Sequence, residues 1–516
     1  MSFRNVNITY RDSFFLFSLS FVFLFMFLLK TPTNGDTYMY AYCISTFEGP
    51  VIHFGYFIIG FIFHTFLQKL GNTSLQTLGH MSVFFGSISV ACMYLFTFEL
   101  TKNRFQSFLA AFILLFSGTF WIFSEHGEVY VPQLAFVSLS ILCIMKKRPL
   151  ISSLFFLVAV SITPTSCLVL PPLIYLIYLK QLEKKQIVSF IVPILLSFIF
   201  LLVWDISRII GILDWAVYSP KIFFENFNYT SLVIRVVYSV IKVFGKAFNL
   251  FSLIALLGFA ILFKHDKKLW FLMLTFSLPF SLYLLNLGLF SDDHLIISFI
   301  VISFLSSYGL SQLFTITNAS IRAHYIITIL FISVHLWVSY LLFLGPELRD
   351  TQELEKVIKT LESEYKTSAI MISDYNFGMA FWYLTQEESD HFLSSGRPNK
   401  YLSEHCPNSK ACLERLKNKF WINLTHLPNF VSQKIDFTQL VENRTIFFAD
   451  RSDCPSWFVQ LLLPDKTLEK RRYEIPNAKK FKNYIEKKFG GKTQLRKIID
   501  SPLYPIYVVN IKSQNI

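Results

Sequence analysis

Residues 13–29 of the chain read SFFLFSLSFVFLFMFLL, an unbroken apolar stretch rich in phenylalanine. As a helix, a stretch of this length crosses the roughly 30 Å hydrocarbon core of a bilayer. Arg4 and Arg11 precede it and no small-residue cleavage site follows it, which favours a retained membrane helix over a signal peptide. Because positive charge stays on the cytoplasmic side, we expect a cytoplasmic N-terminus and an external loop that starts at Thr31.

The composition of the whole chain extends this expectation. Of its 516 residues, 53% are hydrophobic and 16% are charged, whereas a soluble chain carries roughly a quarter charged residues. Long apolar runs recur up to residue 344 and then stop. The net charge of +13 lies partly in short clusters between these runs, as in cytoplasmic loops, which argues against nucleic-acid binding. We therefore predict a polytopic α-helical membrane protein.

The apolar run 51–67 decides the topology. If it spans the membrane, the basic clusters at 146–148, 180–185 and 264–268 fall outside; if it lies in the outer interface, all three fall inside. The positive-inside rule favours the second arrangement. With the first helix this gives about eleven spans. The remaining predicted spans are 77–98, 105–123, 129–145, 150–163, 165–179, 187–204, 247–263, 269–287, 294–314 and 324–344.

An odd number of spans predicts that the rest of the chain lies outside the cytoplasm. We expect a transmembrane domain over residues 1–344, with external loops at about 31–76 and 204–246. Residues 345–516 then form an extracytoplasmic domain. Short apolar strands alternate with charged helical stretches in that region, which is typical of a small α/β domain.

Polar residues gather at the predicted outer ends of the helices, and the most specific group is Glu125-His126-Gly127-Glu128-Val129-Tyr130. Two carboxylates three residues apart on a helical turn share one face, with an imidazole between them. Such a group can bind a divalent cation or accept a proton from a hydroxyl. Ionisable groups at membrane depth are costly and tend to mark function. The alternative is a polar turn at the membrane interface, flanked by Trp and Tyr.

At these residues the chain resembles a known family. Phe120-Trp121 followed by Glu128-Val129-Tyr130 is similar to the signature of the DUF2723 membrane proteins, which are related to protein O-mannosyltransferases of the GT-C glycosyltransferase superfamily. Three further places agree in order over roughly residues 10–390. They are Asn34-Gly35-Asp36-Thr37 in the first loop, the polar turn Val160–Ser166 before Pro171-Pro172, and residues 369–376 with the aromatic segment 381–383. GT-C enzymes also carry juxtamembrane helices in their first external loop, where the run 51–67 falls.

The resemblance implies that a sugar moves from a polyprenyl-phosphate donor to a protein, lipid or glycan acceptor on the outer side of the membrane. It implies a catalytic role for Asp36, as the base for the acceptor hydroxyl or beside a divalent cation. Glu125 and Glu128 would act with it, on the acceptor, the sugar or a cation. Further candidates for substrate binding are Glu48, His53, His126, Tyr130, Thr163, Thr165, Arg208, Arg235, Lys242, Lys246, Asp293 and His294. The four basic residues among them lie in the loop 204–246, where they would meet a lipid phosphate.

Two other functions stay open at the level of sequence. A transporter or flippase for a lipid-linked sugar would also use broken helices, and Pro164 supplies a break. A catalytically inactive GT-C-like scaffold of an envelope complex is the other alternative. The chain departs from the family pattern at Met39, where a Glu is usual, and at Asp292-Asp293-His294, where Arg-Asp-Tyr is expected.

Overall fold

The computed structural model describes most of the helical region and parts of the C-terminal region. The described residues are 3–29, 31–32, 35–46, 53–204, 245, 247–287, 293–317, 320–364, 369–373, 380, 383–384, 420–423, 445–449, 492–500 and 506–512. The chain divides into two units, residues 1–30 with 40–346 and residues 31–39 with 347–516. Each unit is described by itself below.

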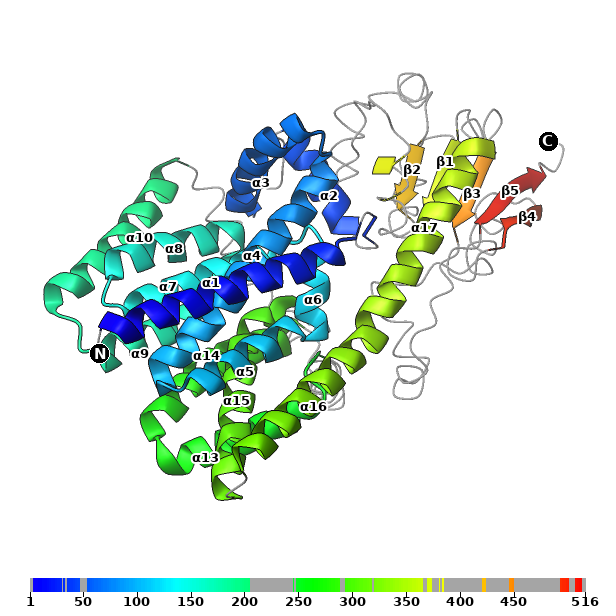
Figure 1. Ribbon diagram of the computed structural model, residues 1–516. Helices are drawn as coiled ribbons and strands as arrows, with labels where there is room; N and C mark the ends of the chain where they lie inside the picture. Colours follow the sequence, from blue (N-terminus) through cyan, green and yellow to red (C-terminus); the bar gives the residue numbers. More distant parts are fainter. Residues whose placement is uncertain are drawn as a thin grey trace. The chain divides into compact units, whose positions relative to one another are not determined.

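The first unit is built of helices (Figure 1). Its long helices are α1 (Phe3–Met26), α3 (Phe54–Leu67), α4 (Ser74–Thr101), α5 (Arg104–Leu115), α6 (Gly118–Glu125), α7 (Tyr130–Met145), α8 (Pro149–Ile162), α9 (Leu170–Leu179), α10 (Lys184–Trp204), α13 (Leu250–His265), α14 (Lys267–Leu287), α15 (Phe299–Ile316) and α16 (Ile321–Ser339). Short turns of helix join them at η2 (Gln68–Leu70), η3 (Pro164–Val169), η5 (Asp293–Ser298) and η6 (Tyr340–Leu344). The helix α2 (Gly35–Thr46) begins in the second unit and continues into the first.

Four helical stretches in the described part of the chain are long and apolar enough to cross a membrane. They are Ile8–Met26, Ser74–Thr101, Ile296–Ile316 and Ile321–Leu361. Five shorter apolar helices accompany them, at Phe54–Leu70, Tyr130–Met145, Pro149–Ile162, Pro164–Leu179 and Leu250–His265. Every span expected from the sequence falls on helical residues, although 105–123 covers two helices and 165–179 covers η3 and α9. The count of about eleven spans stays a prediction.

One predicted span, 105–123, is wrong as a single straight helix. It consists of α5 and α6, which are bent by 63° at a short break. Ser117 adopts an extended backbone there, with φ −64° and ψ 124°. The side chain of Phe343 occupies the position that a Cβ atom at Gly118 would take. Only a glycine therefore allows η6 to pack this closely against the start of α6.

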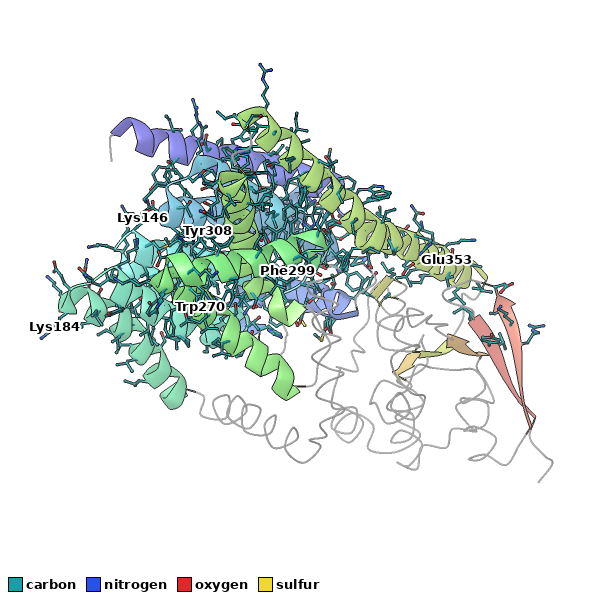
Figure 2. All side chains as sticks on the ribbon, turned by 90° about the horizontal axis from the view of Figure 1, so that it is seen from below. Lys146, Lys184, Trp270, Phe299, Tyr308 and Glu353 are labelled. Carbon is teal, nitrogen blue, oxygen red and sulfur yellow. The ribbon has the colours of Figure 1, made fainter. Side chains whose placement is uncertain are left out.

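Small residues let the helices of the first unit approach one another. The backbones of α13 and α15 meet at Gly258 and Gly309, and Ser306 Oγ donates a 2.8 Å hydrogen bond across this contact to Phe251 O. At the start of α15, the buried ring of Phe299 lies edge-on to Phe248 with a centroid distance of 4.8 Å (Figure 2). Small interfacial residues with hydrogen bonds between helices are typical of packing in membranes, where lipid supplies no hydrophobic driving force.

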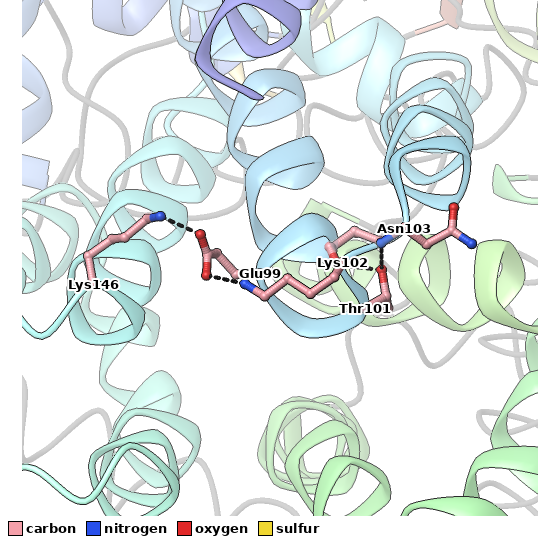
Figure 3. A network of polar contacts seen from close by, with 6 residues as sticks. Glu99, Thr101, Lys102, Asn103 and Lys146 are labelled. Atoms are coloured by element: carbon pink, nitrogen blue, oxygen red, sulfur yellow. Dashed lines mark hydrogen bonds and ion pairs between the residues drawn. The ribbon is translucent and has the colours of Figure 1, made fainter. Parts of the chain in front are cut away.

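Basic loops converge at one end of this unit. The carboxylate of Glu99 binds Lys102 at 2.8 Å and also contacts Lys146, which comes from a different loop (Figure 3). Lys180, from a third loop, lies within electrostatic range of these residues and of Lys147. Burial and the neighbouring lysines lower its pKa, while Glu99 opposes the shift. Two of the basic clusters used in the topology argument therefore share one end of the unit, as the prediction requires.

An ion pair between the buried carboxylate of Asp12 and the 53% exposed side chain of Arg104 joins α1 to α5 near this end. The guanidinium of Arg104 binds both carboxylate oxygens of Asp12, at 2.5 and 2.7 Å, and Tyr94 donates a 2.8 Å hydrogen bond to the same carboxylate. Asp12 is 5% exposed. A buried charge is stable only when it is paired and hydrogen-bonded, and these contacts meet that requirement.

The second unit contains a five-stranded sheet with the order β2-β1-β3-β5-β4. The strands are β1 (Ala369–Ser373), β2 (Phe420–Asn423), β3 (Thr445–Ala449), β4 (Lys492–Ile499) and β5 (Ile506–Lys512). β1 runs parallel to β2 and β3, whereas β5 runs antiparallel to β3 and β4. The helix α17 (Gly345–Glu364) leads into this unit from the first.

Candidate functional site

The acidic segment, residues 125–128, links α6 to α7. Glu125 is the last residue of α6, and His126 follows with an extended backbone at φ −83° and ψ 146°. The predicted arrangement of the two carboxylates on one helical turn is therefore wrong, because the chain leaves the helix between them. The residue exposures are 1% for Glu125, 4% for His126 and 1% for Glu128. The segment is thus enclosed by protein, so a simple surface turn does not describe it.

The helix α3 covers the acidic segment. Tyr56, which is completely buried, donates a 2.7 Å hydrogen bond to the backbone oxygen of Gly127. Burial raises the pKa of the Tyr56 hydroxyl well above its ordinary value, and the negative charge of Glu128 raises it further. Glu128 therefore lies within electrostatic range of the same hydroxyl. The run 51–67, which decided the predicted topology, therefore also contacts the acidic segment.

The polar turn after α8 reaches the same helix. The ring nitrogen Nδ1 of His53, just before α3, lies 2.7 Å from the backbone oxygen of Ile162. Thr163 follows with an extended backbone and is 4% exposed, and its hydroxyl has no hydrogen-bond partner among the residues that the structure describes. The close approach of α3 to α8 depends on Gly55, since a Cβ atom there would overlap Ser161.

Gln133 joins the turn to α7 and was missed in the sequence analysis. Its side-chain amide donates hydrogen bonds to Thr165 Oγ1 at 3.0 Å and to Ser166 Oγ at 2.9 Å. Ser166 in turn donates to Ala159 O at 2.9 Å. The available signal was an amide side chain inside an apolar run, close after the acidic segment, because such a group needs partners at membrane depth.

These contacts bring three of the predicted groups together in the first unit: the acidic segment, His53 on the approach to α3, and the turn with Thr163 and Thr165. The turn η5, which begins with Asp293 and His294, packs against α6 and α7 and so joins this part of the unit. Tyr130 contacts Phe123 with a ring distance of 5.7 Å.

Asp36 lies in the other unit. It occupies the first turn of α2, is partly exposed, and belongs to the segment 31–39 that groups with the C-terminal residues. A carboxylate in the first turn of a helix is stabilised by the helix dipole. The other candidates, Glu48, Arg208, Arg235, Lys242 and Lys246, lie outside the described residues.

A metal site is not defined by this arrangement. Within the described ranges no group of three or more His, Cys, Asp or Glu side chains is placed to hold a metal ion. A divalent cation at Asp36 or at the acidic segment therefore stays a prediction.

The fold is similar to that of solved membrane proteins. ArnT from Cupriavidus metallidurans bound to undecaprenyl phosphate aligns with a TM-score of 0.50 and 8% identity, over 98% of this chain and 97% of that chain. The archaeal oligosaccharyltransferase AglB from Archaeoglobus fulgidus, in complex with an inhibitory peptide and a dolichol-phosphate, aligns with a TM-score of 0.45 and 11% identity, over 81% of this chain and 70% of that one. No family model and no curated protein matches the sequence.

The likeness to ArnT over nearly the full length of both chains shows a GT-C-like fold of the kind found in membrane glycosyltransferases. The predicted GT-C-like fold is confirmed by this likeness, whereas membership of the superfamily stays a prediction. The narrower resemblance to DUF2723 proteins and O-mannosyltransferases stays a prediction.

Proposed function

We propose that the chain is a membrane glycosyltransferase that moves a sugar, of the hexosyl type, from a polyprenyl-phosphate donor to an acceptor on the extracytoplasmic side. The observation that carries this proposal is the convergence of the buried acidic segment, α3 and the Thr163–Ser166 turn inside a GT-C-like fold. Buried ionisable and polar groups are costly in a membrane protein and mark substrate sites. The presence of undecaprenyl phosphate in the ArnT structure supports a lipid phosphate as the carrier.

The reaction assigns a distinct task to Asp36. The acceptor oxygen attacks the anomeric carbon of the sugar, the bond from that carbon to the phosphate oxygen breaks, and its electron pair leaves with the lipid phosphate. The acceptor proton passes to the carboxylate of Asp36, which acts as general base. A partly exposed carboxylate at a helix start suits this task, because the helix dipole favours its anionic form and the residue is partly open to its surroundings.

The remaining candidates bind the substrates. Glu125 and Glu128 would hold sugar or acceptor hydroxyls or a divalent cation, together with His53, His126, Tyr130, Thr163, Thr165, Glu48, Asp293 and His294. Arg208, Arg235, Lys242 and Lys246 would neutralise the departing phosphate, with or without that cation. In this proposal the N-terminus is cytoplasmic, about eleven helices span the bilayer, and residues 345–516 form an extracytoplasmic α/β domain.

The test is transfer of radiolabelled sugar from a panel of polyprenyl-phosphate monosaccharides, in membranes that carry matched levels of each variant. We expect label to reach an acceptor with the wild type and to fall by about 100-fold or more in Asp36→Asn, since loss of a general base costs this much. Asp266→Asn is the matched control, because Asp266 is exposed and caps α14 through backbone hydrogen bonds that Asn can also accept.

Equal transfer by wild type and Asp36→Asn would remove Asp36 from the mechanism and direct attention to Glu125 and Glu128. Absence of transfer from every donor would contradict the proposal. A flipping assay on the same membranes would then decide between the transporter and the inactive scaffold.

A further inference from the structure

The segment that carries Asp36 folds with the C-terminal half of the chain. Residues 31–39 group with residues 347–516, although more than 300 positions separate the two segments in sequence. Thr31 is 4% exposed, Thr37 is 1% exposed and Tyr38 is completely buried. These residues of the first loop are therefore buried and group with the second unit, with Asp36 as a partly exposed residue among them.

Two contacts fix the ends of this segment. At one end the hydroxyl of Thr31 donates a hydrogen bond to the carboxylate of Glu355 on α17. At the other end the ring of Tyr38 packs against Tyr383, with centroids 5.6 Å apart. The Tyr38 hydroxyl also donates a 2.8 Å hydrogen bond back to Pro32 O, which closes a short loop around Asp36.

Glu355 is itself held on an anchored element. One side of α17 is apolar and buried, with residues that are 1–3% exposed: Leu354, Val357, Ile358 and Leu361. Their spacing of three, one and three residues places them on one face of a helix. Lys359, one turn further along, lies 3.6 Å from the Glu355 carboxylate. The acceptor of the Thr31 hydrogen bond is thus fixed by the packing of the whole helix.

We infer that the C-terminal unit positions Asp36 for proton transfer, through Thr31, Glu355 and Tyr38 as positioning residues. This inference rests on the proposed function and gives residues 347–516 a task in catalysis, which is to position Asp36. A general base acts only when its carboxylate reaches the proton that it accepts. An error of about 1 Å in such a placement can reduce a rate by about 100-fold.

The experiment compares Thr31→Val, which removes one hydroxyl at nearly constant volume, with Thr31→Ser, which retains it. Glu355→Ala is compared with Glu353→Ala, the same change two residues away on α17 (Figure 2). Two readouts are needed on the full-length protein: kcat and KM for a polyprenyl-phosphate sugar, and hydrogen exchange of the backbone amides of residues 35–46.

We expect Thr31→Val and Glu355→Ala to lower kcat by about 10-fold, a fraction of the loss that misplacement can cause, and to leave the donor KM within about twofold. The same two variants should exchange faster at residues 35–39. Thr31→Ser and Glu353→Ala should resemble the wild type in both readouts, which excludes a general loss of stability.

Unchanged exchange in Thr31→Val and Glu355→Ala would overturn the inference, as would an equal loss of kcat in Glu353→Ala. Failure of the proposed function gives a different result. In that case the wild type transfers no sugar from any donor, while the exchange measurement still decides whether the C-terminal unit holds the Asp36 segment.

Discussion

The candidate carboxylates occupy two contrasting environments. Asp36 is partly exposed, stands in the first turn of α2 and belongs to the second unit. Glu125 and Glu128 are each 1% exposed and belong to the first unit, where α3 covers their segment. A partly exposed carboxylate can be replaced by an amide with little effect on folding, whereas a buried one is part of the packing. Replacement of Asp36 should therefore lower sugar transfer without changing stability, whereas replacement of Glu128 should lower both.

The largest combined effect, on sugar transfer and on stability together, is expected at the buried residue Glu128. Glu128→Gln keeps the size of the side chain and removes its charge beside Tyr56. We expect sugar transfer to fall by about 100-fold, as for loss of a charged catalytic or binding group. We also expect a loss of stability of about 1–3 kcal/mol, because the new amide must find hydrogen bonds in a buried site.

Thermal unfolding in detergent, followed for Glu128→Gln and Asp36→Asn side by side, measures the contrast. Only the Glu128 variant should unfold at a lower temperature, and Glu183→Gln on an exposed loop serves as the control. Equal unfolding temperatures of the two variants would show that the burial of Glu128 does not make its carboxylate more important for stability than that of Asp36.

The sequence predicted the helices and the break at Pro164, but not the break within 105–123. The length of an apolar run follows from the thickness of the bilayer, so runs such as 129–145 mark helices directly. The bend between α5 and α6 depends on Phe343, which lies far along the chain from Gly118. The extended backbone at His126 likewise has no local signal. Contacts of this kind arise from tertiary packing and cannot be read from periodicity.

In the candidate site, too, the polar residues could be predicted from the sequence but their contacts could not. The acidic segment and the Thr163–Ser166 turn were predicted because polar residues stand out in apolar sequence. Their connection through Gln133, and the hydrogen bond from Tyr56 to Gly127, required the fold. Grouping of the Asp36 segment with the C-terminal residues could not be predicted either, since it joins distant parts of the chain.

An intermediate effect is expected at His335, which supports the bend that precedes the acidic segment. This histidine is completely buried, with Nδ1 2.8 Å from Asn249 Nδ2 and Nε2 3.2 Å from Ile113 O. The Asn249 amide nitrogen can only donate, so Nδ1 accepts and Nε2 donates to Ile113 O. In a regular helix the amide of Ser117 would donate to Ile113 O. At the break it donates to Leu114 O instead, so Ile113 O depends on His335 for a hydrogen bond.

His335→Leu should therefore leave a buried carbonyl unsatisfied and cost about 1–3 kcal/mol of stability. Transfer should fall only severalfold, since the bend directs α6 without contacting substrate. His335→Gln, which retains a donor, should restore part of both losses in the same unfolding and transfer measurements. A His335→Leu protein with unchanged stability would show that the hydrogen bond to Ile113 O does not stabilise the bend.

The smallest effect on stability and transfer is expected at Glu99. This carboxylate is largely buried but has no proposed role in catalysis, so it tests burial without function. Its side chain is 12% exposed, and each of its two oxygens contacts a lysine, Lys102 or Lys146 (Figure 3). The lysines are 53% and 39% exposed, so solvent screens both pairs, and such pairs contribute about 0.2–1 kcal/mol each. Because Glu99→Gln weakens both pairs, it should lower the free energy of unfolding by at most about 2 kcal/mol, less in high salt than in low salt. It should leave transfer unchanged. A loss of transfer in Glu99→Gln as deep as in Glu128→Gln would mean that removal of any largely buried carboxylate disables the protein. The loss of transfer in Glu128→Gln would then no longer support an active site at the acidic segment.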